Sequence, residues 1–335
     1  MHETRVSTPF PMNAPHAALR GGIDLGGTKI QAVVLDAEHR VLGQHRLPTP
    51  TERGPASVVS AMADALRAAA NAANSDVRAL ASVGVGTPGA VDPRAGTVAS
   101  AKNLSGFDGV VPLAELLANE LALPVALGND VGVALDGEAK LGAGADLASF
   151  VGAWWGTGIG GGVVLNGKRW LGRSAAGELG HMVVKREGAL CPCGRRGCVE
   201  AYAGRRAMEL RARRLVAKGR KTKLFTIMEK KGLARLTSGV FAKALEHDDE
   251  LALELVERAV AALAAGLASA VNLLDVEGVV VGGGLGTRLG EPWVRKLELA
   301  MRPHLFVPTR PPVVRVSKLG DLAGAIGASL LRPAT

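Results

Sequence analysis

The segment IDLGGTK at residues 23–29 decides the fold, because it places two adjacent glycines between two short apolar stretches. The flanking stretches have the composition of β-strands, and Gly26 with Gly27 marks the turn between them. Glycine has no Cβ atom, so the backbone N–H groups of such a turn can approach phosphate oxygens, and the Thr28 hydroxyl adds a donor. We therefore predict a strand–turn–strand unit that can hold phosphate. A glycine hairpin without a ligand is the plain alternative for this segment alone.

The second half of the chain repeats this arrangement. An apolar stretch at residues 148–154 leads into the glycine-rich turn GTGIGGG at residues 156–162, and a further strand follows at 163–165. The repetition predicts a divergent duplication of one supersecondary unit, with one phosphate-facing turn in each half. A third cluster, GGG at residues 282–284, follows a buried strand at 278–281 and suits a flat ligand lying on the backbone.

Between the glycine turns, segments with helical periodicity alternate with short apolar segments. Helices are predicted from Pro55, over residues 112–121 and over 131–141, and strands over 80–85 and 124–127. This alternation is typical of an α/β fold with a largely parallel sheet. The predicted organisation consists of a loose leader at 1–20, an N-terminal α/β domain at 21–135, a C-terminal α/β domain at 136–320, and a last helix at 321–332 that packs back on the first domain.

The composition of the 335 residues is that of a globular enzyme. It is 47% hydrophobic and 21% charged, which excludes disorder as the main state, and only 3% aromatic, which disfavours sites built on stacked bases. The formal charge of +9 is compatible with an anionic partner, but equally with a solvated helical face along the basic stretch 195–231. No apolar stretch suits a signal peptide or a membrane span, so we expect a cytoplasmic protein without a membrane or nucleic-acid partner.

The three cysteines lie close together in the sequence. Cys191, Cys193 and Cys198 follow His181 by ten to seventeen positions. Three thiolates and one imidazole satisfy a tetrahedral Zn²⁺, and a complete shell leaves no open position for water. We therefore predict a structural zinc site at residues 181–198, with free core cysteines as the alternative.

Asn129 and Asp130 follow a predicted buried strand and precede a predicted helix. This position puts a carboxylate at the carboxyl end of a strand, where it can accept a proton from a hydroxyl that attacks a phosphorus atom. An Asp here could instead cap the helix. The sequence alone leaves both roles open.

The glycine turns and two further segments carry a family resemblance. The three glycine turns, in this order, resemble the superfold shared by sugar kinases, actin and heat-shock ATPases. GELGH at 177–181 with CPCGRRGCVE at 191–200 resembles the signature of the ROK family (repressors, open reading frames and sugar kinases). The likeness extends from about residue 22 to 331 and is greatest to bacterial glucokinases and related hexose or N-acetylhexosamine kinases. It implies a two-domain actin-like (ribonuclease H-like) fold of duplicated βββαβα units with an interdomain cleft.

The resemblance also implies roles for individual residues. ATP would occupy the cleft, and Asp24 would hold Mg²⁺ directly or through water. The implied nucleotide-binding residues are Asp24, Gly26, Gly27, Thr28, Lys29, Gly156, Thr157, Gly158, Gly283 and Gly284. The implied sugar-binding residues are Gly89, Asn103, Asn129, Asp130, Glu178, His181 and Glu200, with Asp130 as catalytic base. His181 would ligate zinc through one ring nitrogen and donate to the sugar from the other.

The activity implied is phosphorylation of a hexose, glucose at its 6-hydroxyl, with Mg-ATP. The family pattern continues after the catalytic pair with Ala-Asn-Ala-Ala, whereas residues 131–134 here are VGVA. This departure affects the expected local packing and substrate preference, and not the expected reaction. Alternatives are a kinase for an N-acetylhexosamine or fructose, a polyphosphate-dependent glucokinase, and a sugar-responsive regulator. About twenty residues precede the first strand, too few for a three-helix DNA-binding domain. The resemblance further implies a homodimer or homotetramer.

Overall fold

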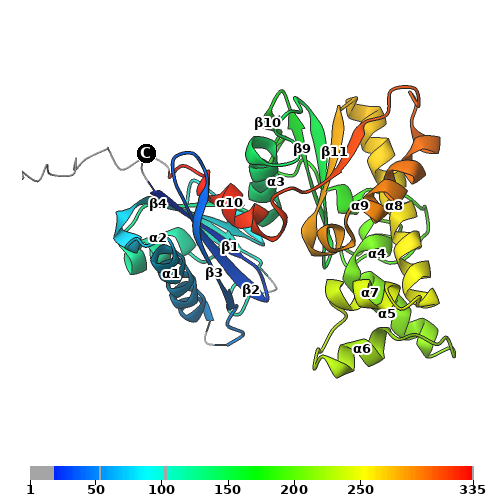
Figure 1. Ribbon diagram of the computed structural model, residues 1–335, viewed down its shortest axis with the longest axis horizontal. Helices are drawn as coiled ribbons and strands as arrows, with labels where there is room; N and C mark the ends of the chain where they lie inside the picture. The colour runs from blue at the N-terminus through cyan, green and yellow to red at the C-terminus, as the bar shows by residue number, and fades with distance from the viewer. Residues whose placement is uncertain (1–18, 53, 102–103, 334–335) are drawn as a thin grey trace, which may run out of the picture.

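The computed structural model describes residues 19–52, 54–101 and 104–333. These residues form two five-stranded sheets, each with helices packed against it, and Figure 1 shows the two halves side by side. None of the described helices is long and apolar enough to cross a membrane. The predicted leader falls almost wholly outside the described residues.

The first sheet contains the opening glycine turn. Its strands are β1 (Leu19–Leu25), β2 (Lys29–Leu35), β3 (Val41–Pro48), β4 (Leu80–Thr87) and β7 (Val125–Asn129). The order is β3-β2-β1-β4-β7, with an antiparallel β1–β2–β3 meander and parallel pairing of β1, β4 and β7. Helices α1 (Gly54–Ala72) and α2 (Leu113–Leu121) contribute buried apolar side chains to the core of this half. The short strands β5 (Ala90–Asp92) and β6 (Thr97–Ala99) form a separate hairpin.

The second sheet repeats the same topology. Its strands are β8 (Phe150–Trp155), β9 (Ile159–Leu165), β10 (Lys168–Arg169), β11 (Gly278–Gly282) and β12 (Val313–Val316). The order β10-β9-β8-β11-β12 again combines an antiparallel meander with parallel strands, so the predicted duplication is confirmed. Strand β10 ends at Arg169, shortly before the chain turns at Gly172, whose φ is +56°.

Most of the helices lie in the second half. They are α4 (Glu200–Ala203), α5 (Arg205–Val216), α6 (Leu224–Lys230), α7 (Ser238–Leu245), α8 (Glu250–Leu274) and α9 (Gly283–Met301). The long α8 begins at the N-cap Asp249, whose carboxylate accepts from the backbone N–H of Ala252 at 2.7 Å. Its apolar face forms the centre of the largest buried cluster. Short 3₁₀ turns occur at Val77–Ala79, Leu179–His181, Arg302–His304 and Gly320–Leu322.

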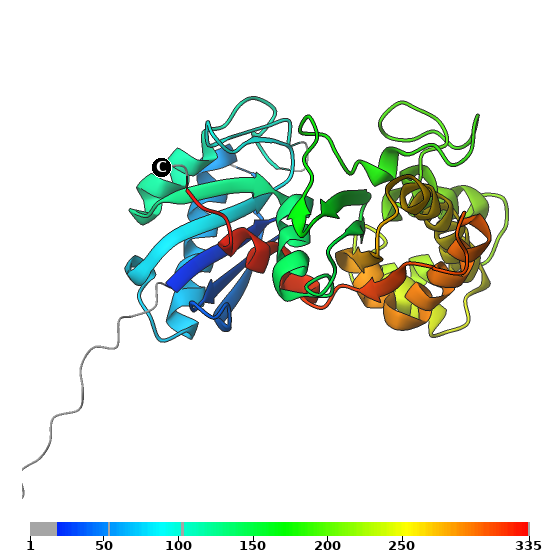
Figure 2. The same cartoon turned by 90° about the horizontal axis from the view of Figure 1, so that it is seen from above.

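Two helices connect the halves. Helix α3 (Asp130–Leu141) packs against α10 (Ala323–Ser329), and α10 in turn packs on β1, β2 and β4. Figures 1 and 2 both show α10, in red, between the two sheets. The helices approach so closely at Gly327 that a Cβ atom there would overlap the carbonyl oxygen of Val133. Small residues on α10 therefore permit the close packing of the two helices.

A buried carboxylate fixes the connection between β12 and α10. Glu138 on α3 is fully buried and accepts hydrogen bonds from the Ser317 hydroxyl and from the backbone N–H groups of Ala143, Lys318 and Leu319. Charge-assisted hydrogen bonds of this kind are about twice as strong as neutral ones. They hold the chain that enters α10, and with it one wall of the space between the halves.

Candidate functional site

A cavity of about 270 Å³ lies between the two halves. Residues of all three glycine turns line it, together with the start of α3 and the segment before α10. The predicted nucleotide residues in its lining are Asp24, Thr28, Lys29, Gly156, Thr157, Gly283 and Gly284. Gly26, Gly27 and Gly158 belong to the same turns without lining the cavity. Turns more than a hundred residues apart in the sequence thus face one space.

The first turn is braced from behind. The backbone N–H of Gly26 donates to the Lys29 carbonyl at 2.9 Å, and the Thr49 hydroxyl donates to the Gly26 carbonyl at 2.6 Å. Across the cavity, the Lys29 ammonium lies 3.8 Å from Asp321. This contact joins strand β2 to the segment that leads into α10.

Asp24 and Asp130 repel each other in the cavity. Burial, followed by the nearby charge of Asp130, raises the pKa of Asp24 to about 6. Burial also raises the pKa of Asp130 above its ordinary value, opposed by hydrogen bonds from the backbone N–H groups of Val131 and Asp130. Gly324 permits the arrangement, because a Cβ atom there would lie 2.7 Å from the Asp24 carboxyl carbon. Two crowded carboxylates without a compensating ion pair indicate a site for a cation.

Asn129, and not Asp130, caps helix α3. Its side-chain oxygen accepts from the backbone N–H of Gly132 at 3.0 Å, with the extended backbone typical of an N-cap. Asp130 is the first residue of the helix, and its carboxylate lines the cavity. The capping role considered for Asp130 therefore falls to its neighbour.

Arg205 is a cavity residue that the sequence reasoning missed. The Arg205 guanidinium donates to the Thr157 hydroxyl at 2.7 Å and to the Ser238 hydroxyl at 3.0 Å, and burial lowers its pKa. Among the residues that the structure describes, Arg205 forms no ion pair, so its charge is available to an anion in the cavity. Arg205 is therefore not part of the solvated helical face considered for the basic stretch. Its position after the ROK-like segment was the only signal in the sequence.

Two tryptophans beside the second turn have different environments. Trp155 is buried and donates from its indole nitrogen to the Ala203 carbonyl at 2.7 Å, as expected of a core residue. Trp154 lines the cavity, close to Gly282. The two environments differ because alternate residues of strand β8 face opposite sides of the sheet.

The predicted sugar residues other than Asn129 and Asp130 come from both halves of the chain. The Glu200 carboxylate accepts from the backbone N–H of Ile159 at 2.8 Å, and Glu178 lies 4.0 Å from the Nε2 atom of His181. Gly89 lies in the turn between β4 and β5, with a φ of +98°. Gly89, Glu178, His181 and Glu200 do not line the 270 Å³ cavity. Asn103 lies outside the described residues.

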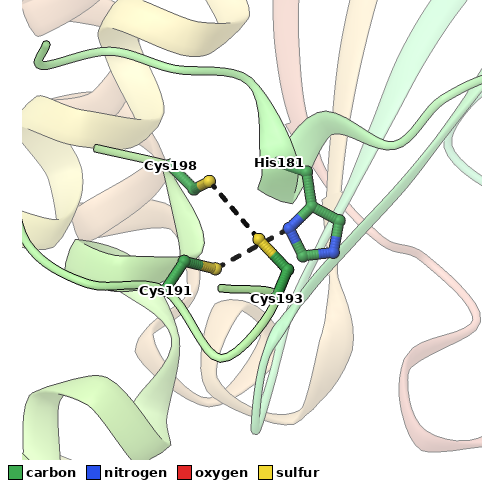
Figure 3. Close-up of side chains that lie close together, drawn as sticks. All are labelled: His181, Cys191, Cys193 and Cys198. Carbon is green, nitrogen blue, oxygen red and sulfur yellow. Dashed lines mark hydrogen bonds between the residues drawn. The ribbon is translucent and has the colours of Figure 1, made fainter. Parts of the chain in front are cut away.

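His181 and the three cysteines converge on one point. One ligand atom from each residue lies within 4.8 Å of all the others, and Figure 3 shows the four side chains facing one another. The Nδ1 atom of His181 is 3.8 Å from the Cys191 sulfur, and the sulfurs of Cys193 and Cys198 are also 3.8 Å apart. Four ligands at about 2.3 Å from a tetrahedral zinc ion lie about 3.8 Å from one another. The geometry therefore fits zinc.

The chemistry of the cluster also fits a cation. Burial raises the pKa of Cys191. The backbone N–H of Arg195, and then its guanidinium, lower the pKa of Cys193, which favours the thiolate that a metal requires. The positive φ of Gly194 and Gly197, +88° and +81°, turns the chain so tightly that the three sulfurs meet. His181 contributes Nδ1 to the cluster and directs Nε2 towards Glu178.

The protein has the two-domain actin-like ATPase fold, and the cavity lies in the cleft between its halves. The ROK family model matches residues 20–334, and the chain belongs to the ROK family. It is 34% identical over 317 residues to the glucokinase of Thermotoga maritima, covering 92% of this chain and 95% of the relative.

Two further similarities extend the comparison. The chain is 32% identical over 311 residues to the N-acetylmannosamine kinase of Pasteurella multocida, covering 92% of this chain and 94% of the relative. The crystal structure of a ROK family glucokinase from Streptomyces griseus in complex with glucose and AMPPNP matches with a TM-score of 0.77 and 30% identity, covering 93% of this chain and 98% of that chain. The predicted fold class and family are confirmed.

Proposed function

We propose that the protein is an ATP-dependent sugar kinase that phosphorylates glucose at its 6-hydroxyl. The observation that carries the proposal is the cavity in which Asp130 meets three glycine turns in a chain of the ROK family. The glucokinase relatives and the glucose and AMPPNP complex of a similar kinase support the choice of substrates. ATP would lie along the cavity, and the sugar would lie beside it, at Asp130 and the second turn.

Asp130 is the proposed general base. The sugar hydroxyl transfers its proton to the Asp130 carboxylate as its oxygen forms a bond to the γ-phosphorus. The bond from that phosphorus to the oxygen of the β-phosphate breaks, and ADP leaves. Because Asn129 caps α3, Asp130 is free to point into the cavity. Its raised pKa makes it a better proton acceptor than an ordinary carboxylate.

Asp24 and Arg205 are the proposed charge-handling residues. A bound Mg²⁺ would neutralise negative charge that develops on the phosphates during transfer. Asp24 would hold this ion directly or through water, since burial and Asp130 leave its carboxylate in need of a cation. Arg205 would donate to a phosphate from the opposite wall, next to Thr157. Lys29 lies on the first turn and would exchange its contact with Asp321 for a phosphate.

The cysteine cluster is proposed to bind a structural zinc ion. The four ligands complete a tetrahedral shell, so the ion would act by positioning residues. His181 links the cluster to Glu178 through its second ring nitrogen. Zinc would therefore fix the orientation of a sugar-binding acid without contacting the phosphates.

The test of the activity is a coupled assay of ADP release on the full chain with Mg-ATP. The acceptors are glucose, mannose, fructose, glucosamine and the N-acetylated hexosamines, and polyphosphate replaces ATP in a parallel series. We expect turnover with glucose and ATP, lowered by about 10² to 10⁴ in Asp130→Ala, the range for loss of a general base. Asp64→Asn, at an exposed acid on α1, serves as a matched control.

Two outcomes would redirect the proposal. Preference for an N-acetylhexosamine would favour the second candidate, which the 32% identity to an N-acetylmannosamine kinase supports. Absence of turnover with every acceptor and donor would contradict a kinase and favour a sugar-responsive regulator. Calorimetric binding of glucose without turnover would identify that case.

The zinc proposal predicts that loss of the metal impairs the sugar site. Metal analysis of the purified protein should give one zinc per chain, and Cys198→Ser should remove it. The apparent KM for glucose should rise by about tenfold or more, since mutating groups that hydrogen-bond to metal ligands typically changes metal affinity or activity by 10- to 100-fold. The KM for ATP should stay unchanged. Unchanged glucose kinetics in the zinc-free protein would contradict the positioning role.

A further inference from the structure

A second, larger cavity lies where α3, α10 and the β9–β10 hairpin meet. Its volume is about 610 Å³, within the range typical of small-molecule sites. Helix α3 begins at Asp130 in the first cavity and reaches this one at Asp136 and Lys140. At a rise of about 1.5 Å per residue, Asp136 lies roughly 9 Å along the helix axis from Asp130. The two cavities are therefore separate sites on one helix.

Charges around this second cavity are unbalanced. Lys140, Lys168 and Arg169 line it with a single acid, Asp136. The Arg169 guanidinium already binds Asp136, with its Nε atom 2.9 and 3.1 Å from the two carboxylate oxygens. Lys140 and Lys168 are exposed and form no ion pair within the described part of the chain. The lining thus carries two ammonium groups without a counter-charge.

His39 lies near Lys140 and other basic groups. Burial, followed by the nearby charges of Lys140, Arg20 and Arg332, lowers the pKa of His39. The acid in this neighbourhood, Asp36, is held by Arg40 through its backbone N–H at 2.8 Å and its guanidinium at 2.6 Å. Asp36 is therefore already paired with Arg40.

The lining of the second cavity also has an apolar part. Leu147, Leu330 and Leu331 line it, together with Ala139 and Ala145. A ligand with one anionic end and one organic end would match both walls, because its charge would meet the lysines and its carbon skeleton the leucines. Inorganic phosphate would leave the apolar wall uncovered.

We propose that this cavity binds a small phosphate monoester, its phosphate held between Lys140 and Lys168 and its organic part against Leu147 and the two leucines that follow α10. The walls come from both halves, with α10 packed on the first sheet and the β9–β10 hairpin belonging to the second. The Arg169 guanidinium also lies on Gly132, where a Cβ atom would come within 2.6 Å of it. The ligand would therefore contact the same arginine that packs beside the start of α3.

The test is isothermal titration calorimetry of the full chain with ribose 5-phosphate. Inorganic phosphate and ribose are separate arms, and the double variant Lys140→Ala/Lys168→Ala is compared with wild type. The matched control is Lys221→Ala/Lys231→Ala, which removes the same charge from exposed positions of the basic stretch. Binding is measured without turnover, so the result does not depend on the proposed kinase activity.

We expect saturable one-to-one binding that weakens at least tenfold in the cavity variant and less than twofold in the control. Raising the salt concentration should weaken it further, as for any partly exposed charge contact. Binding of ribose alone, or of phosphate as tightly as the ester, would overturn the assignment to a phosphate monoester. Equal losses in both double variants, or no saturable binding to wild type, would overturn the site itself.

Discussion

Two of the three carboxylates on helix α3 lie in opposite electrostatic conditions. Glu138, in its third turn, is fully buried and accepts four hydrogen bonds. Asp130, at its start, faces a cavity and another carboxylate, and its pKa is raised. The difference shows that burial alone does not mark a functional acid. A structural carboxylate has its donors supplied by the fold, whereas a reactive one lacks them until a ligand binds.

The largest expected contrast comes from neutralising these two acids in turn. Asp130→Asn should lower kcat by about 10² to 10⁴ and leave thermal stability unchanged or slightly higher. Glu138→Gln should destabilise the fold by about 2 to 4 kcal/mol, because its amide N–H groups would face backbone donors. Activity per folded molecule should stay near that of wild type. Denaturant unfolding and single-temperature kinetics on both variants would separate the effects.

The matched control for Glu138 is Glu257→Gln, at an exposed acid on α8. This variant should unfold within about 0.5 kcal/mol of wild type. Equal stability of Glu138→Gln and wild type would contradict the structural role of Glu138. A Glu138 variant that lost kcat while staying folded would show that the two carboxylates do not divide their roles in this way.

Asp24→Asn should change stability in the direction opposite to Glu138→Gln. Its pKa of about 6 lies above the ordinary 3.8, so ionised Asp24 disfavours the folded state at pH 7 in the absence of a cation. The amide should stabilise the ligand-free protein by about 1 to 3 kcal/mol and lower activity strongly. The gain should shrink as the pH falls from about 6 to 4, where the folded wild type already protonates Asp24. Stability curves at pH 4.5 and 7.5 would measure this, and a constant gain would contradict the repulsion.

The smallest expected effect concerns the acid limb of the pH profile. The raised pKa of Asp130 should shift the fall in kcat/KM to a higher pH than an ordinary Asp would give, because only the ionised carboxylate accepts a proton. Bound Mg²⁺ would counteract part of the shift. Profiles at two Mg²⁺ concentrations would test this, and an acid limb near pH 4 in both would refute the raised pKa.

Local features of the site could be predicted from the sequence. The glycine turns at Gly26 and Gly156 and the close approach of α10 at Gly327 depend on residues without a Cβ atom, whose effect extends over a few positions. The convergence of Cys191, Cys193 and Cys198 follows from two tight glycine turns in the same short segment. The duplicated sheet topology follows from a hydrophobic pattern that occurs twice.

Other features depended on elements far apart in the chain. Arg205 looked like part of a basic helical surface, and only the packing of α5 beside the second turn brings it to Thr157. Trp154 lines the cavity because of the face that β8 presents to the cleft. The cavity at Lys140 and Lys168 needs three elements from both halves.

The sequence by itself determined the two glycine-bounded units, the cluster of His181 and the three cysteines, and the family, because each is written in residues close together along the chain. Tertiary structure decided which charges stay uncompensated. The repulsion between Asp24 and Asp130, the isolation of Arg205 and the complete hydrogen bonding of Glu138 all depend on distances between strands and helices that meet only after folding. Electrostatic energy depends on separation and burial in space, and neither can be read from spacing along the chain.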